Sequence, residues 1–430
     1  MTPSPRKLTG EAYLSHVDQT REVDVAIVGA GPAGCAAAIE ATRAGYTVEV
    51  VDKASAGRDK TCGDGLTTEA LRLLEHLGWQ PEQCSTARQI DTVMVRAPGG
   101  RTVALPLPVG GLQAVTVTRA DLDRSLGELA ASAGAAVTYD WTVADVAVTT
   151  DGVTLLGPDG DKVTASIVLA ADGAWSPLRK KLCPPKTPHL GAMHAYRQYV
   201  TGFTDDRLWV IFQQDLGAGY VWAFPLGNGI ANIGFGIHRQ PGVSTKGMSS
   251  LWEEIKRRPS VADVLGHAEP IEKARAWPIP ANLDDTPLAF GRVLFIGDAA
   301  AATDPLTGEG IAQALWTGIE AARSLRHPGR PLSSSEVAAI GDRYRARVLS
   351  GLARDMRFAR RLRRVLASAR RADMAIAVTD VSDWTRRNFA RWLFEDYPRA
   401  LLVTPDRWDT EAGPRRIFGR QPIDRMPYRR

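Results

Sequence analysis

A glycine-rich segment near the start of the chain has the residue types and spacing to bind a dinucleotide. It runs from Val25 to Gly34 and reads Val-Ala-Ile-Val-Gly-Ala-Gly-Pro-Ala-Gly, and Asp52 follows where the next strand should end. Gly29 permits a tight turn, Gly31 lets a pyrophosphate approach the backbone, and Gly34 lets helix and strand pack closely. The N–H groups that start the helix would face the phosphates, and Asp52 would accept hydrogen bonds from ribose hydroxyls. The segment therefore predicts dinucleotide binding, without specifying which dinucleotide.

Two later segments again combine glycines and acids after buried strands. One runs from Val168 to Arg179 and contains Asp172 and Gly173; the other runs from Arg292 to Ala300 and is followed by Pro305 to Ile311. Together with the first segment, and in this order, they resemble the flavoprotein superfamily that shares the p-hydroxybenzoate hydroxylase fold. The resemblance implies that the dinucleotide is FAD and that the flavin carries the redox chemistry.

The resemblance also implies a contact with FAD for each motif. Asp298 matches the acid that hydrogen-bonds the ribityl chain, and it has a second reading as a cap on the following turn. Asp172 and Gly173 match the segment near the pyrophosphate. The resemblance also adds Arg119 to the cofactor-binding residues, and it implies that the backbone of Val143 faces adenine. The cofactor-binding residues indicated by the motifs and the resemblance together are Gly29, Gly31, Pro32, Ala33, Gly34, Asp52, Lys53, Arg58, Cys62, Gly63, Arg119, Val143, Asp172, Gly173, Gly297, Asp298, Pro305, Gly308, Gly310 and Ile311.

The third glycine-rich stretch should open a helix that extends to about Leu325. We expect the N-terminus of this helix, at Gly308 to Ile311, to point at the pyrimidine edge of the flavin, where the reduced form carries negative charge. The positive end of the helix dipole would then favour the reduced anion by about 1 kcal/mol.

Two further segments narrow the resemblance. One is the loop Arg58–Leu66, which contains Cys62, and the other is the strand Gly219–Pro225, which has a Tyr-x-Trp-x-Phe-Pro pattern. They are similar to the geranylgeranyl reductase family, whose members saturate isoprenoid C=C bonds. The resemblance implies hydride transfer from flavin N5 to an isoprenoid or similar apolar substrate. It makes Cys62, Tyr220 and Trp222 the candidate catalytic residues, and an aromatic strand suits a substrate that offers little to hydrogen-bond.

These residues also have structural readings. Trp222 and Phe224 are equally consistent with core packing and with lining a cavity, because alternating aromatic residues are common in protein cores. Cys62 is either a small residue in a glycine turn or a thiol that tunes the flavin. The proton for the second alkene carbon would come from Cys62, Tyr220 or a water molecule.

Two rival functions fit the same motifs. The fold also supports FAD-dependent monooxygenases of secondary metabolism, which hydroxylate or epoxidise, and, less readily here, halogenases, because the strand only partly resembles the halogenase motif. The second rival is a non-catalytic flavin-binding partner protein. Since no second G-x-G-x-x-G occurs, electrons would come from transiently bound NADPH or NADH, an electron-carrier protein or a quinol.

The elements that must position these motifs are those of a βαβ unit. The sequence predicts a strand at Val23–Val28, an Ala-rich helix that ends near Ala44, and a strand at Thr47–Val51. Further helices are expected at Thr67–Leu77 and Arg119–Ala133.

The predicted fold class is α/β, and the chain of 430 residues suits two domains. A Rossmann-type FAD-binding domain of residues 20–91, 117–188 and 276–330 is interleaved with an antiparallel-sheet substrate domain of residues 92–116 and 189–275. Residues 331–430 are expected to form a C-terminal helical region.

Positive charge is concentrated late in the chain. The formal net charge is +5, and eleven arginines lie between Arg343 and Arg371. Apolar residues recur at three- and four-residue spacing from Leu349 to Ala369, which predicts one helix with an apolar stripe and a basic back. The favoured reading is a surface helix docked on its own protein. The alternatives are a peripheral membrane contact through residues 343–371, which would meet anionic lipid, or attraction of an acidic substrate. No nucleic-acid-reading motif accompanies the charge, so nucleic-acid binding is not expected.

The remaining composition excludes several classes. The four cysteines include no C-x-x-C pair, and no histidines cluster at ligand spacing, so neither a disulfide framework nor a metal site is expected. This usage fits a reducing cytoplasm, and Cys35 is expected to be a packing residue. No stretch approaches the roughly 18 to 20 apolar residues that span a bilayer. Residues 1–22 lack an apolar core, so we expect a disordered leader rather than a secretory signal.

Overall fold

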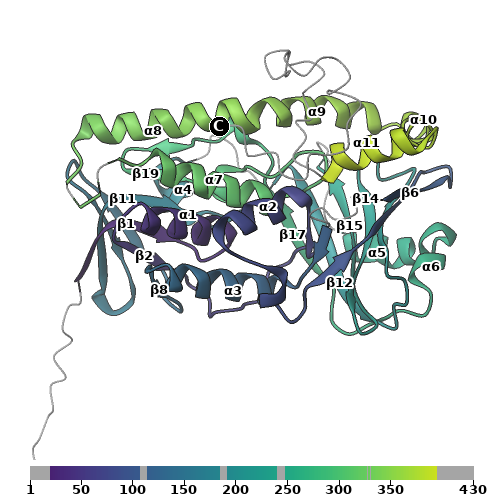
Figure 1. Ribbon diagram of the computed structural model, residues 1–430, viewed down its shortest axis with the longest axis horizontal. Coiled ribbons are helices and arrows are strands. Elements are labelled where there is room, and N and C mark those ends of the chain that lie inside the picture. The colour runs from purple at the N-terminus through teal and green to yellow at the C-terminus, as the bar shows by residue number, and fades with distance from the viewer. Residues whose placement is uncertain are drawn as a thin grey trace, which may run out of the picture.

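The computed structural model describes residues 20–106, 114–184, 191–239, 247–326, 328–329 and 331–394. Most of the expected leader, and the end of the expected C-terminal region, lie outside these residues. Two large sheets stand beside each other, and helices cover them along one edge of the molecule (Figure 1).

The first sheet has a parallel centre and carries the glycine motifs. Its strand order is β18-β19-β11-β1-β2-β8, and the pairs from β19 to β8 are parallel. Val25–Val28 are buried, as expected for a strand that is covered on both faces. The strands are β1 (Thr20–Val28), β2 (Val48–Val51), β8 (Ala136–Thr138), β9 (Asp145–Val148), β10 (Val153–Leu156), β11 (Lys162–Ala170), β18 (Ala289–Phe290) and β19 (Val293–Phe295).

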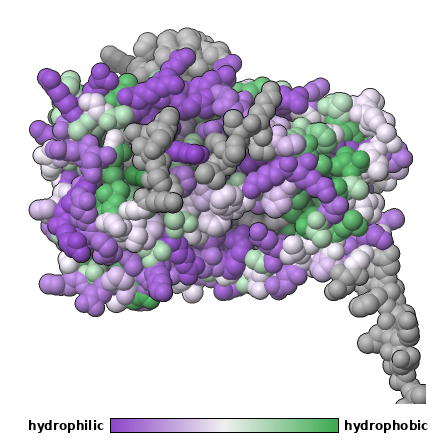
Figure 2. All heavy atoms as spheres, turned by 180° about the vertical axis from the view of Figure 1, so that it is seen from behind, coloured by the Kyte–Doolittle hydropathy of each residue, from purple (hydrophilic) through white to green (hydrophobic). Residues whose placement is uncertain are grey.

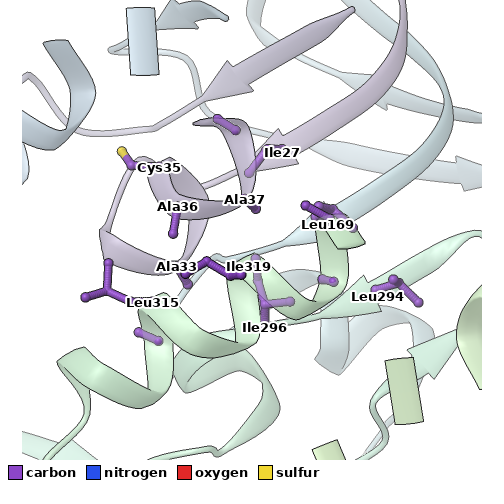
Figure 3. Packing of buried hydrophobic residues seen from close by; sticks show 14 of the residues in the cluster. Ile27, Ala33, Cys35, Ala36, Ala37, Leu169, Leu294, Ile296, Leu315 and Ile319 are labelled. Atoms are coloured by element: carbon purple, nitrogen blue, oxygen red, sulfur yellow. The ribbon is translucent and has the colours of Figure 1, made fainter. Parts of the chain in front are cut away.

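Small residues bring helices close to this sheet and to one another. Ala33, Ala36 and Ala37 of α1 (Pro32–Arg43) lie beside Leu315 and Ile319 of α7 (Ile311–Ser324) in the core (Figure 3). A Cβ on Gly318 would lie 2.2 Å from the Ala33 carbonyl oxygen, so the two helices can approach this closely only because that position is glycine. Cys35 is fully buried in the same core, which confirms its packing role.

The expected helices of the first half are confirmed by their caps. The Thr67 hydroxyl accepts a hydrogen bond from the Ala70 N–H at the start of α2 (Thr68–Leu77), and Gly78 ends the helix in the left-handed region at φ 97°. Thr118 caps α3 (Arg119–Ser132) in the same way. The shorter helix α4 (Pro177–Leu182) and the single turns Pro81–Gln83, Pro158–Gly160, Leu283–Asp285 and Gly297–Ala300 complete this part.

The second sheet is antiparallel except where β5 meets β13. Its order is β16-β12-β15-β14-β13-β5-β6, with β17 also paired to β12. The strands are β5 (Thr92–Arg96), β6 (Thr102–Pro106), β12 (Met193–Thr201), β13 (Leu208–Phe212), β14 (Tyr220–Gly227), β15 (Ile230–His238), β16 (Glu269–Pro270) and β17 (Arg275–Ile279). Because β17 belongs to this sheet, the sheet extends past the domain boundary that we predicted at residue 275. A third, small sheet has the order β3 (Gly65–Leu66), β7 (Ala114–Thr116) and β4 (Arg88–Ile90). In the chain, its strands come after β2 and before β8, on either side of β5 and β6.

The two faces of β14 have different neighbours. Val221 and Ala223 belong to a core with Phe235 and with Trp252 of α5 (Met248–Arg257), and the rings of Phe235 and Trp252 stack at 5.8 Å. The short helix α6 (Pro259–Leu265) adds to that core. The alternate residues of β14, from Tyr220 to Phe224, point the other way, into a cavity.

The prediction of a single basic helix over residues 343–371 is wrong. α8 (Ser334–Val348) passes through a π-helical turn, Leu349–Ala353, into α9 (Arg354–Leu366), and the two run on along one edge of the molecule (Figure 1). The extra residue in such a turn rotates the helix face, so Leu349 is exposed while Met356 and Ala359 are buried. The chain then continues as α10 (Ala369–Thr379) and α11 (Asp383–Phe394).

The expected docking of this region on its own protein is confirmed for α8. Its Tyr344 hydroxyl donates a 2.8 Å hydrogen bond to the Phe295 carbonyl of β19, and Arg343 binds the Ser324 carbonyl at the end of α7. None of the described helices is both long and apolar enough to cross a membrane.

Candidate active site

One cavity of about 740 Å³ collects most of the residues that the sequence motifs singled out. It is bounded by the glycine turn after β1, the loop that contains Cys62, the segments around Asp172 and Asp298, and the aromatic side of β14. This size lies within the range of ligand sites in proteins. The cavity therefore joins the predicted cofactor motifs to the predicted substrate strand.

The glycine turn is shaped for a ligand at one position and for packing at the others. A Cβ on Gly29, where φ is 109°, would lie 2.3 Å from the Ala171 carbonyl oxygen, and one on Gly34 would lie 1.8 Å from the Gly29 carbonyl oxygen. A Cβ on Gly31 would meet no atom within 4 Å and would project into space that belongs to the cavity. The open backbone at Gly31, at the N-terminus of α1, fits the pyrophosphate of FAD.

Asp52 is buried and braces this turn. Its carboxylate accepts hydrogen bonds from the backbone N–H groups of Ala30, at 2.7 Å, and Ala54, at 2.8 Å. Each carboxylate oxygen has a further lone pair, so the side chain still fits a ribose hydroxyl. Lys53, Arg58 and Val143 also line this end of the cavity.

Arg119 is held rigidly by its own helix. Its guanidinium forms two 2.8 Å hydrogen bonds with the Asp123 carboxylate one turn later, and Arg58 lies 3.5 Å from the same carboxylate. Both arginines line the cavity, so they place positive charge beside the position that suits the pyrophosphate.

The second motif is built around a capped helix. The Asp172 carboxylate accepts from the Ser176 hydroxyl at 2.7 Å and from the Leu178 N–H at 3.0 Å, so it caps α4. Burial raises the pKa of Asp172. A Cβ on Gly173, where φ is 80°, would again meet nothing within 4 Å, and Gly173 lines the cavity.

Asp298 lines the cavity as part of an ion pair that the sequence did not indicate. The Lys60 ammonium lies 3.1 Å from its carboxylate. Although burial alone would raise the pKa of Asp298, the Lys60 charge lowers it, so the side chain is ionised at neutral pH. An ionised acid at this place can accept hydrogen bonds from a ribityl hydroxyl.

The start of α7 differs from the expectation of a free positive helix end. Glu309 places its carboxylate 2.9 Å from the N–H groups of both Ile311 and Ala312. This carboxylate neutralises part of the helix dipole, because it satisfies two of the N–H groups that have no partner within the helix. Gly308, Gly310 and Ile311 nevertheless line the cavity.

Four aromatic rings form one wall of the cavity. They follow one another along β13 and β14 with centroids 6.1, 6.2 and 6.3 Å apart, and they belong to Phe212, Tyr220, Trp222 and Phe224. The rings of Trp222 and Phe224 are therefore both part of the interior packing and part of the cavity wall. The Tyr220 hydroxyl donates to the Thr307 carbonyl, which ties this wall to the third glycine-rich stretch.

The loop that contains Cys62 lies against this wall. A Cβ on Gly63 or Gly65 would come within 3.3 or 3.1 Å of the Phe224 ring, so both glycines allow the close contact. Cys62 lines the cavity, and burial raises the pKa of its thiol, so the sulfur is protonated at neutral pH.

A buried hydrogen-bond network fixes the loop from behind, and sequence reasoning missed it. Asn232 of β15 donates 2.7 Å hydrogen bonds to the Cys62 carbonyl and to the Asp64 carboxylate, and it accepts one from the Trp222 indole at 3.0 Å. Tyr199 of β12 donates to the same Asp64 oxygen, Oδ2, as Asn232 does. Burial raises the pKa of Asp64 to about 6, although Tyr199 and Asn232 lower it in part.

Only one residue of this network could be recognised from the sequence. Asp64 was visible as an acid within the glycine-rich loop, but nothing near Tyr199 or Asn232 marks them, because their partners lie 135 and 168 positions away. Three predicted cofactor residues, Gly34, Gly297 and Pro305, are not among the residues that line the cavity. Residues that line it without having been predicted include Asp59, Lys60, Phe212, Arg275, Trp277, Leu366 and Phe389.

Comparison with known proteins places this site in a family. Residues 22–330 match the family model described as an FAD binding domain. The chain is similar to a menaquinone reductase of Mycobacterium tuberculosis, with 34% identity over 75% of this chain and 80% of the relative. It is also similar to a digeranylgeranylglycerophospholipid reductase of Methanopyrus kandleri, with 31% identity over 69% of this chain and 75% of the relative.

Solved structures show the same fold. A geranylgeranyl bacteriochlorophyll reductase-like protein of Thermoplasma acidophilum superposes with a TM-score of 0.70 at 21% identity, covering 90% of this chain and all of the other. A flavin-dependent brominase superposes with a TM-score of 0.70 at 17% identity, covering 90% of this chain and 99% of the other. The predicted α/β flavoprotein fold is therefore confirmed, and at these identities the likeness is one of fold alone.

Proposed function

Because this chain belongs to the geranylgeranyl reductase family of FAD-dependent oxidoreductases, we propose that it reduces C=C bonds in the isoprenoid chain of an apolar substrate. The observation that carries this proposal is the shape of the cavity. Glycine turns that fit a dinucleotide form one side, and four consecutive aromatic rings form another. Such a wall binds an unfunctionalised chain by area and shape, since the chain has no polar group to recognise.

The head group of the substrate is uncharged in this proposal. Two cations that line the cavity beside the Cys62 loop are already paired with carboxylates: Arg275 lies 2.7 Å from Asp59 and 3.1 Å from Glu272, and Lys60 lies 3.1 Å from Asp298. An additional phosphate would have to compete with these pairs. A polyprenylated quinone fits this charge pattern better than a phospholipid, and one of the similar proteins is named as a menaquinone reductase.

The residues around the glycine turns are proposed to hold FAD. Gly31 and Gly173 leave room for the pyrophosphate, Arg58 and Arg119 supply positive charge, and Asp298 accepts from the ribityl chain. When bound, FAD supplies the hydride. The chain's own contribution is to orient the alkene on the aromatic wall and to hold a proton for its second carbon, for which the protonated thiol of Cys62 is our candidate. Tyr220 is a weaker candidate, because its hydroxyl proton is already donated to Thr307.

We further propose that NADPH or NADH reduces the flavin transiently, with an electron-carrier protein or a quinol as alternatives. The four cysteines are free thiols, which suits a cytoplasmic protein. A peripheral contact with the membrane would bring the protein to its apolar substrate.

Anaerobic reduction of a menaquinone tests the function. The FAD-loaded protein is reduced with NADPH or dithionite, a menaquinone is added without oxygen, and flavin absorbance and product mass are followed. We expect the flavin absorbance to return once no dithionite remains. After the product is reoxidised in air, which returns any quinol to the quinone, its mass should still be higher by two hydrogens per event. A monooxygenase would instead leave the flavin reduced until air is admitted, and its product would gain oxygen. Failure of dithionite-reduced protein to react under both conditions would support the non-catalytic alternative.

A further inference from the structure

A row of apolar residues is exposed along α10, the turn that follows it and the start of α11. Met374 is 62% exposed, Val378 64%, Val381 74% and Trp384 52%. Met374 and Val378, four residues apart, lie on one side of α10, and Val381 and Trp384 follow in the turn and in the first turn of α11. The opposite side of α10 packs on the protein through Ala372, Ile376 and Thr379, which are buried. The helix α10 therefore has two apolar sides, of which one packs on the protein and the other, with Met374 and Val378, is exposed.

The exposed row is part of a firmly attached helix. The Gly99 N–H donates a 2.7 Å hydrogen bond to Asp373, and Arg101 lies 3.2 Å from Asp380, so α10 is fixed to the turn between β5 and β6. Figure 1 shows α10 and α11 together at the end of the molecule where β6 lies. The side chains of the row thus face outward from a rigid platform.

Positive charge adjoins the row. Arg361, Arg364, Arg370 and Arg371 are exposed and form no salt bridge with any residue that the structure describes. Val365, which is 45% exposed, lies among them. Acids are present nearby, but Asp380 and Asp383 are paired with Arg386 at 2.8 and 2.7 Å. Unpaired arginines beside a Trp, a Met and valines form the side-chain pattern that binds the interface of an anionic bilayer.

Two helices of this region, α9 and α11, also form part of the cavity wall. Leu366, at the end of α9, and Phe389, on α11, both line the cavity. The helices before and after α10 in the chain therefore both reach the cavity. On the face seen from behind, hydrophilic residues predominate and hydrophobic residues gather in separate groups (Figure 2).

We propose that the surface formed by Val365, Met374, Val378, Val381 and Trp384, with Arg361, Arg364, Arg370 and Arg371 around it, docks on an anionic lipid bilayer. The arginines contact the lipid headgroups, and the apolar row enters the region between headgroups and acyl chains. This assignment moves most of the apolar part of the membrane contact beyond residues 343–371, the segment that the sequence indicated, and only Val365 lies within that segment. The inference that docking delivers substrate to the cavity rests on the proposed function, whereas the docking itself does not.

Vesicle binding tests this surface without reference to turnover. The full-length FAD-loaded protein is sedimented with vesicles of phosphatidylcholine alone and of phosphatidylcholine with phosphatidylglycerol. We expect partitioning to the anionic vesicles only, a decrease with added salt, and at least a tenfold loss in the double variant Val378→Asp/Val381→Asp. The matched control is Ile271→Asp/Phe290→Asp, which places two acids on other exposed apolar positions and should bind like the wild type.

Two outcomes would overturn the proposal. One is a wild-type protein that stays in the supernatant with anionic vesicles, and the other is equal loss of binding in both double variants. Sedimentation velocity without lipid tests whether the surface binds a second copy of the chain instead. If the wild type self-associates, the Val378→Asp/Val381→Asp variant does not, and no vesicle binding is seen, the surface is an interface between copies. Because anaerobic alkene reduction of a short-chain quinone in solution is scored separately, failure of the function and failure of docking are distinguishable.

Discussion

The Tyr199 hydroxyl donates a 2.6 Å hydrogen bond to the fully buried carboxylate of Asp64. Tyr199 belongs to the second sheet, whereas Asp64 belongs to the loop that carries Cys62, so this bond joins the predicted substrate strand region to the predicted cofactor side. Arg197 stacks on the Tyr199 ring, with its guanidinium carbon 3.9 Å from the ring centroid. The loop is therefore held by a buried ionisable group in addition to its contact with the Phe224 ring.

Asp64 should make stability depend on pH in a defined direction. Burial raises the pKa of Asp64 to about 6 in the folded protein, above the ordinary value of about 4 for an aspartate, so the folded state holds the proton to a higher pH than the unfolded state. The stability that this proton confers is present below the unfolded pKa and is lost as the pH rises through about 6, amounting to about 3 kcal/mol. Urea unfolding of the wild type and of Asp64→Asn from pH 4 to pH 8 measures it. We expect the free energy of unfolding of the wild type minus that of the variant to fall with rising pH. A constant difference would show that Asp64 does not titrate in this range.

Gly31 and Gly34 should separate cofactor binding from folding. In Gly31→Ala the new Cβ meets nothing within 4 Å, and the backbone φ of −81° suits alanine, so the free energy of unfolding without FAD should change by less than about 0.5 kcal/mol. The methyl group occupies the space proposed for the pyrophosphate, and the Kd for FAD should rise at least tenfold. Gly34→Ala is the contrast, because its Cβ would lie 1.8 Å from the Gly29 carbonyl oxygen and should destabilise the fold by more than about 1 kcal/mol. Unchanged FAD affinity in Gly31→Ala would contradict our placement of the pyrophosphate.

The ion pair between Lys60 and Asp298 should stabilise the protein at neutral pH. Lys60→Met leaves the carboxylate without its partner, and we expect a loss of about 1 to 2 kcal/mol at pH 7, less than for a fully buried pair. The Asp298 pKa is lowered in the folded wild type, so the contribution exists above the unfolded pKa and is lost as the pH falls below it. Urea unfolding at pH 7 and at about pH 3, which lies below the unfolded pKa of about 4, should show the deficit shrinking at the lower pH. Lys60→Arg, which keeps the charge, should retain most of the stability at both.

Cys62 should affect the alkene step and not flavin reduction. If its protonated thiol supplies the proton, Cys62→Ala should lower the rate of anaerobic alkene reduction about 100-fold or more while leaving the rate of flavin bleaching by NADPH unchanged. Cys62→Ser, which keeps an acidic hydrogen, should recover part of the rate. Cys84→Ala is the control, because Cys84 is buried and is not among the residues that line the cavity. Full alkene reduction by Cys62→Ala would remove the thiol as proton donor.

The sequence predicted what local rules control. Thr67 and Gly78 bound α2 because a hydroxyl cap and a left-handed glycine act within a few residues of themselves. The Cys62 loop could be assigned to the cavity because its motif is contiguous. Tyr199 and Asn232 could not, since they reach Asp64 only through the pairing of distant strands. Glu309 was within reach of prediction, because an acid just before a helix commonly binds the first N–H groups.

The order of the strands in the first sheet has a consequence for how the protein is made. β1 ends at residue 28, but the strand beside it, β11, begins at residue 162, and β19 begins only at residue 293. A ribosome needs on the order of tens of seconds to synthesise the intervening chain. β2 can pair with one edge of β1 early, but the other edge has no partner until β11 is made, and β11 in turn waits for β19. Asp298 is also absent until then, so the nascent chain cannot yet enclose FAD. Capture of the cofactor is therefore a late event of biosynthesis, and an incomplete chain would expose unpaired strand edges to chaperones or to aggregation.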